Sequence, residues 1–165
     1  MRPLPRLFPA SLLFGSVVLT GCGPAEEADP CVSGDEPTLE VGKGELEYQD
    51  MGAEDGTAEL IHGPQGGYHL NIALQGSFLD ASAPLEAELT GWIDGEEVGH
   101  TLPYATMRCN QAAGALQAWG LLLIWDAEPE ALHEKTTTVE VELTDASGET
   151  ISASSDVVIW DPSLE

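Results

Sequence analysis

Three segments of the chain alternate apolar and polar residues with a period of two, and this pattern constrains the fold most. Apolar side chains occupy every second position of 68–75, 85–93 and 139–143, with mostly polar residues between them. Successive side chains of a β-strand point to opposite faces of a sheet, so these segments are predicted to be strands that bury one face. Turn-forming residues separate them at intervals of about 8–12 residues. The pattern therefore predicts an all-β fold, an antiparallel β-sandwich.

Weaker signals complete the predicted sandwich. The apolar run 116–125 indicates a central strand covered on both faces, with a short helix over 112–122 as the alternative. Residues 105–114, which contain Cys109, are expected to form a long loop. The remaining expected elements are short strands at 38–41, 46–48, 57–62, 98–104 and 151–159, a hairpin turn at Asp94-Gly95 and a helical turn at 128–132.

The start of the chain has the features of a secretory signal. Two arginines precede a mostly apolar run over 7–19, which is too short to span a bilayer. Residues 19–22, Leu-Thr-Gly-Cys, resemble the lipobox of bacterial lipoproteins. The resemblance implies cleavage before Cys22, acylation of Cys22 and stable membrane anchoring, and Gly23 implies sorting to the outer membrane. The alternative is an ordinary cleaved signal followed by a chance cysteine.

Acidic residues outnumber basic residues 29 to 5 among the 165 residues, which gives a formal net charge of −24. This balance excludes a nucleic-acid-binding protein, because no cationic surface is available to displace phosphate counterions. Hydrophobic residues still make up 42% of the chain, which is typical of a folded domain rather than a disordered acidic tail. We expect a lipoprotein signal peptide over 1–21, a lipidated, acidic, flexible tether over 22–37 and a β-sandwich domain over 38–165.

Two cysteines remain if Cys22 is lipidated. Cys31 and Cys109 are then an even number in an oxidising compartment, which predicts a disulfide between them. Such a bond would close a loop of about 79 residues and fasten the end of the tether to the domain. The alternative is two free buried thiols.

The C-terminal third carries a second resemblance. Residues 139–148 have the pattern Val-x-Val-x-Leu-Thr-Asp-x-x-Gly, which resembles the final hairpin of bacterial immunoglobulin-like repeats. The resemblance extends over about 35 residues and implies that the sandwich is immunoglobulin-like.

Few residues indicate chemistry. The sequence has no nucleophile elbow, no metalloprotease helix motif and no phosphate-binding glycine loop, so we expect no catalysis and no cofactor. His62 and His69 flank a glycine-rich loop and are weak candidates for a metal site. The turn carboxylates Asp94, Glu96 and Asp145 are weak candidates for Ca²⁺. The alternative for all five is a polar residue at a strand end or a solvated turn.

Trp92 is the candidate binding aromatic, because it alternates with glutamate and threonine on the outward side of its strand. An exposed indole can anchor a partner or stack on a sugar ring, and the alternative is that a loop or the tether covers it. Trp119, Trp125 and Trp160 are expected in the core.

Together these features predict a lipid-anchored, non-catalytic envelope lipoprotein that acts as an interaction or structural module. Its expected partners are the membrane, reached through the lipid anchor, and an envelope protein or a glycan. The alternative is a ligand-binding lipoprotein for divalent cations or glycans.

Overall fold

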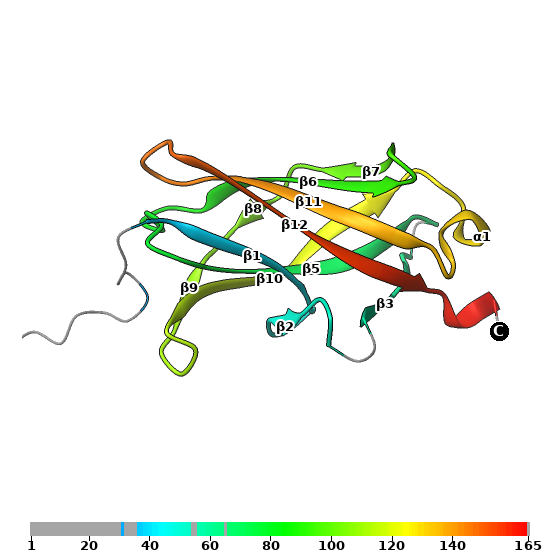
Figure 1. Cartoon of the computed structure of the whole chain (residues 1–165), viewed down its shortest axis with the longest axis horizontal. Helices are drawn as coiled ribbons and strands as arrows, with labels where there is room; N and C mark the ends of the chain where they lie inside the picture. Colours follow the sequence, from blue (N-terminus) through cyan, green and yellow to red (C-terminus); the bar gives the residue numbers. More distant parts are fainter. Residues whose placement is uncertain (1–30, 32–35, 54–55, 65, 165) are drawn as a thin grey trace, which may run out of the picture.

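The computed structural model describes residues 31, 36–53, 56–64 and 66–164, and within them the chain folds as an all-β sandwich (Figure 1). This confirms the predicted fold class and the helical turn near residue 130. The elements are β1 (Thr38–Lys43), β2 (Gln49–Asp50), β3 (Thr57–Glu59), β4 (Ile61–His62), β5 (Tyr68–Ser77), β6 (Leu85–Ile93), β7 (Glu96–Thr101), β8 (Tyr104–Ala105), β9 (Arg108–Asn110), β10 (Ala115–Trp125), α1 (Pro129–Leu132), β11 (Thr136–Thr144), β12 (Thr150–Trp160) and the 3₁₀ turn η3 (Pro162–Leu164).

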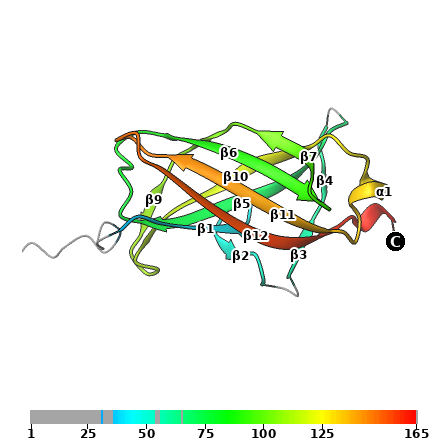
Figure 2. The same ribbon diagram turned by 45° about the horizontal axis from the view of Figure 1, so that its top comes forward.

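Two layers of strands enclose the core. One layer has the order β2-β1-β5-β10, with β4 paired to β5 and β9 paired to β10. The other layer has the order β7-β6-β11-β12-β3, with β8 beside β6. Figures 1 and 2 show β1, β5 and β10 on one side of the molecule and β6, β11 and β12 on the other. The pairings between described strands are antiparallel except for the short parallel pair of β12 and β3.

The alternating segments bury the side chains that the sequence predicts. In β5, Leu70, Ile72 and Leu74 are fully buried, and β6 and β11 contribute aliphatic side chains from the opposite layer. The Asp94-Gly95 hairpin also forms as expected: the φ angles are 52° and 82°, which a two-residue type I′ turn requires. Burial on one face of each sheet therefore sets the register of the sandwich.

The two layers meet at Trp125, the last residue of β10. Trp125 pairs with Gly99 of β7, and its indole lies against the bare backbone of Gly91 and Gly99. A Cβ at Gly91 would overlap the indole ring, and one at Gly99 would lie 2.6 Å from a ring carbon. The Trp125 side chain thus closes this end of the core, and the two glycines make room for it.

Two sequence predictions about the first layer are wrong, and one alternative is excluded. The segment 46–48 is a loop, because Gly44 turns away from β1 with φ 142°. The helix alternative for 112–122 does not form, since β10 is a strand. That strand is not covered on both faces: Leu122 and Ile124 are 41% and 44% exposed.

Candidate functional site

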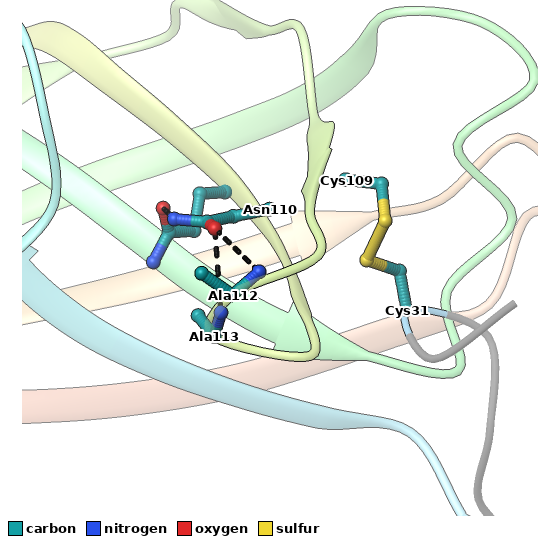
Figure 3. The surroundings of a disulfide bond; sticks show 6 residues. Cys31, Cys109, Asn110, Ala112 and Ala113 are labelled. Atoms are coloured by element: carbon teal, nitrogen blue, oxygen red, sulfur yellow. Dashed lines mark hydrogen bonds between the residues drawn. A yellow bond between two sulfur atoms is a disulfide. The ribbon is translucent and has the colours of Figure 1, made fainter.

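Cys31 and Cys109 form a disulfide, which confirms the predicted pairing (Figure 3). Their Cα atoms are 5.6 Å apart. Cys31 is fully buried and belongs to the hydrophobic core, whereas Cys109 lies on β9. The bond therefore fixes the chain that precedes the sandwich to the edge of the β5–β10 layer. Cys22 lies outside the described residues, so its lipidation stays a prediction.

His62 and His69 do not form a pair. In the β4–β5 hairpin, His62 is the register partner of Tyr68, and Ile61 is the partner of His69. Neighbouring residues of a strand point to opposite faces, so the two imidazoles lie on opposite sides of the sheet. The hypothesis that they share a metal site is therefore wrong. No group of three histidine, cysteine, aspartate or glutamate side chains that could hold a metal occurs within the described residues.

His62 instead contacts Asp161, a fully buried carboxylate that follows β12. The His62 Nε2 atom lies 2.9 Å from Asp161 Oδ2, and the Asp161 backbone N–H donates to Nδ1 of His133 at 3.1 Å. Burial alone would raise the pKa of Asp161, but hydrogen bonds from Ser163 and His62 outweigh burial and lower it. The cluster fastens the end of β12 to β4 and to the segment after α1.

The turn carboxylates have different surroundings. Asp94 and Glu96 are exposed at the β6–β7 hairpin. Asp145 is 8% exposed, and backbone N–H groups occupy its oxygens: Oδ1 accepts from Ser147 and Glu149, and Oδ2 accepts from Asp80. Asp145 is therefore a structural acceptor that shapes the β11–β12 turn and ties it to the loop before β6.

The Asp145 carboxylate makes stability depend on pH. Burial raises its pKa, but the hydrogen bonds from Ser147, Asp80 and Glu149 outweigh burial and lower the pKa below the ordinary value of 3.8. Such a group stabilises the fold above its unfolded pKa, and this stabilisation is lost as the pH falls through the folded pKa. We expect Asp145→Asn to lower the free energy of unfolding by about 1–3 kcal/mol at pH 7, because an amide donor replaces an acceptor.

Urea unfolding of both proteins at pH 7 and at pH values below 3.8 tests this prediction. The difference between wild type and Asp145→Asn should shrink as the pH falls through the folded pKa of Asp145. Asp94→Asn makes the same chemical change at an exposed turn and should have little effect at either pH. A difference that is constant across the pH range would contradict the role assigned to Asp145.

Trp92 lies on the outward face of β6, as expected, and is half-buried. Its Nε1–H donates to Oε2 of Glu140, on the neighbouring strand β11, at 3.1 Å. The indole is thus engaged by its own sheet, and its role in binding stays a prediction.

Trp119 is the outward-facing aromatic that sequence reasoning misses. The pairing of β10 with β5 shifts between Ala118 and Leu121, so Trp119 and Gly120 oppose the single residue Ala73. Gly120 adopts φ 70°, and its N–H donates to the Gly44 oxygen at 2.9 Å. This β-bulge places Trp119 on the outer face, where it is half-buried, as Trp92 is in the other layer. A glycine inside an apolar strand is the signal that could have indicated it.

Around Trp119, the outer face of the β5–β10 layer is unusually apolar for so acidic a chain. Leu122 and Ile124 follow the bulge, opposite Asn71 and His69 of β5, and Leu46 of the 44–48 loop is 78% exposed. A shallow hollow lies between this loop and the strand. We call this surface the Trp119 face; it comprises the residues that line the hollow and the neighbouring Ile124, namely Glu45, Leu46, Ile61, His69, Asn71, Trp119, Gly120, Leu122 and Ile124.

On the other side of Trp119, the outer face becomes polar. A second hollow is lined by Arg108, Cys109, Asn110, Gln111, Ala112, Gln117 and Trp119, and we call it the amide hollow. The Arg108 guanidinium carbon lies 6.0 Å from the centre of the Trp119 ring. The disulfide holds β9, and all three residues of β9 line this hollow, so the hollow depends on the bond.

No protein-family model and no curated protein matches the chain. The helices within the described residues are too short or too polar to cross a membrane.

Proposed function

We propose that the protein is a lipid-anchored, non-catalytic lipoprotein of the outer membrane whose sandwich acts as an interaction module through the Trp119 face. The observation that carries the proposal is the exposure of Leu46, Leu122 and Ile124 together on one side of a sheet, next to Trp119. Contiguous apolar surface of this kind marks interaction sites, and aromatic residues are typical anchors within them.

The proposed occupant is an envelope protein with an apolar patch rimmed by basic residues. Acids outnumber bases 29 to 5, so a basic rim complements the charge around the Trp119 face. A second copy of the chain is disfavoured as the occupant, because two such acidic molecules repel one another.

Two further observations support this assignment. The strand order β1-β5-β10 in one layer and β7-β6-β11-β12 in the other corresponds to the A-B-E and C′-C-F-G layers of immunoglobulin-like sandwiches, which commonly serve as interaction domains. The lipobox-like motif at 19–22 supplies the anchor, and the disulfide at Cys31 limits the free length between the anchor and the domain to the eight residues 23–30.

The lipid anchor is tested by Cys22→Ser. We expect the variant to lose palmitate labelling and to leave the membrane fraction, because a serine hydroxyl cannot be acylated by this route. The double variant Cys31→Ser/Cys109→Ser is the control and should keep its label. Labelling that persists in Cys22→Ser would exclude the lipidation site.

The interaction surface is tested by Leu122→Asp/Ile124→Asp in full-length, membrane-derived protein. Wild type should migrate in detergent as a complex larger than one chain, and the double variant should migrate as a single chain. Ser152→Asp/Ser154→Asp adds the same charge to exposed positions of β12 in the other layer and should keep the complex. Loss of the complex in both variants, or in neither, would contradict docking at the Trp119 face.

The alternative function is that of a ligand-binding lipoprotein, and the amide hollow favours glycans as its ligands. Asp145 is not a suitable ligand for a divalent cation, because backbone N–H groups occupy its oxygens.

A further inference from the structure

The amide hollow is free of carboxylates, although the chain carries 29 acidic residues. Its lining combines one guanidinium, three side-chain amides and one indole. Arg108 is exposed and forms no ion pair within the described part of the chain. The guanidinium is therefore available to a ligand at the edge of a hollow that no described carboxylate lines.

The amides of the hollow are held in place by hydrogen bonds along the outer face. Asn110 Nδ2 donates to Gln117 Oε1 at 2.9 Å, and Gln117 Nε2 donates to Gln75 Oε1 at 2.6 Å. Gln75 in turn donates to Glu40 at 3.0 Å, so the row crosses β9, β10, β5 and β1. The Gln117 side chain is 6% exposed, which makes it a fixed floor rather than a mobile surface group.

The rim is fixed by the turn that follows β9. Asn110 Oδ1 accepts from the backbone N–H groups of Ala112 and Ala113 at 3.1 and 3.3 Å, as Figure 3 shows. This turn places Gln111 at the edge of the hollow, where its amide makes no hydrogen bond within the described residues. Gln111 and Arg108 therefore present unused donors beside a fixed aromatic wall, and preorganised groups of this kind lower the entropic cost of binding.

We propose that the amide hollow binds an uncharged pyranose glycan. Trp119 would stack on the apolar face of a sugar ring, while Arg108 and the side-chain amides would pair with ring hydroxyls, which donate and accept hydrogen bonds. The long-range field of a chain with net charge −24 opposes polyanionic ligands, so an uncharged glycan is favoured over an acidic one. The site is distinct from the aliphatic part of the Trp119 face and does not depend on docking there.

Calorimetric titration of the full-length protein in detergent tests the proposal. The probes are cellohexaose and chitohexaose, which are uncharged, and an oligogalacturonate of similar length, which is acidic. We expect saturable binding of at least one uncharged probe and weaker binding of the acidic probe at low salt. Trp119→Ala should weaken binding about tenfold, and Gln111→Ala about threefold. Trp92→Ala tests the competing candidate in the other layer, and the affinity should be unchanged if the glycan lies in the amide hollow.

Three results would overturn the proposal. The first is no saturable binding of either uncharged probe below about 10 mM. The second is binding that Trp92→Ala abolishes and Trp119→Ala leaves intact. The third is preferential binding of the acidic probe at low salt.

Gln111 lies in an exposed turn, so Gln111→Ala keeps the test valid if Trp119→Ala fails to fold. Migration of the Leu122→Asp/Ile124→Asp variant is independent of these titrations, so the two proposals can fail separately.

Discussion

Trp125→Ala is expected to lower the free energy of unfolding by about 3–5 kcal/mol, the largest effect of any single substitution considered. The Trp125 side chain is 4% exposed and closes the end of the core where β10 meets β7. Its indole lies against Gly91 and Gly99, which carry no side chain that could move into the space that alanine leaves. A domain of this size is stable by only about 5–15 kcal/mol, so the loss would be a large fraction of the total.

Urea unfolding measures the loss of stability in Trp125→Ala. Two further variants, measured in the same way, separate packing from other effects. Trp125→Phe should cost less than Trp125→Ala, because phenylalanine fills part of the space and removes an indole N–H that has no partner within the described residues. Trp92→Ala makes the same change on the outer face of β6 and should cost about 1 kcal/mol or less. If Trp125→Ala were no more costly than Trp92→Ala, the assignment of Trp125 as the closure of the core would be wrong.

The double variant Cys31→Ser/Cys109→Ser is expected to be less stable than wild type by about 5 kcal/mol. The disulfide joins residues separated by 78 positions, and cross-linking a loop of this length restricts the unfolded chain by about 4.5 kcal/mol. The fully buried position of Cys31 adds to the effect, because the serine hydroxyl enters the core. Thermal or urea unfolding under non-reducing conditions measures the loss.

Reduction of the wild-type protein should give a similar loss, since it removes the same cross-link without a substitution. Cys22→Ser should leave the free energy of unfolding unchanged, because that residue is predicted to lie outside the sandwich. Equal stability of the reduced and oxidised wild-type proteins would show that the bond does not contribute to the fold.

The predictable part of the fold is the part where burial on one face decides the structure. β5, β6 and β11 follow from strict alternation, and the β6–β7 hairpin follows from Asp94-Gly95, because two positive φ angles are required there. The disulfide follows from the cysteine count. Each of these features depends on local chemistry that the sequence states directly.

The candidate site could not be derived in the same way. A one-residue shift in pairing at the bulge moves side chains between the faces of a sheet, and alternation alone does not show where the shift occurs. Trp119 is therefore predicted to lie in the core, whereas the structure places it half-buried on the outer face. An apolar run such as 116–125 also does not show whether both faces are covered, because coverage depends on other segments. The same limit applies to His62 and His69, whose faces depend on the hairpin register.

Photo-cross-linking in intact cells at the position of Leu122 tests the central claim most directly, because it records what lies against the Trp119 face. A photoreactive residue at Leu122 should give one discrete adduct with a different envelope protein, and the same residue at Ser154, on the exposed side of β12, should not. The mass of the adduct distinguishes that partner from a second copy of this chain or from lipid. An adduct with a second copy, an adduct with lipid, or equal cross-linking at both positions would contradict docking of a partner protein at the Trp119 face.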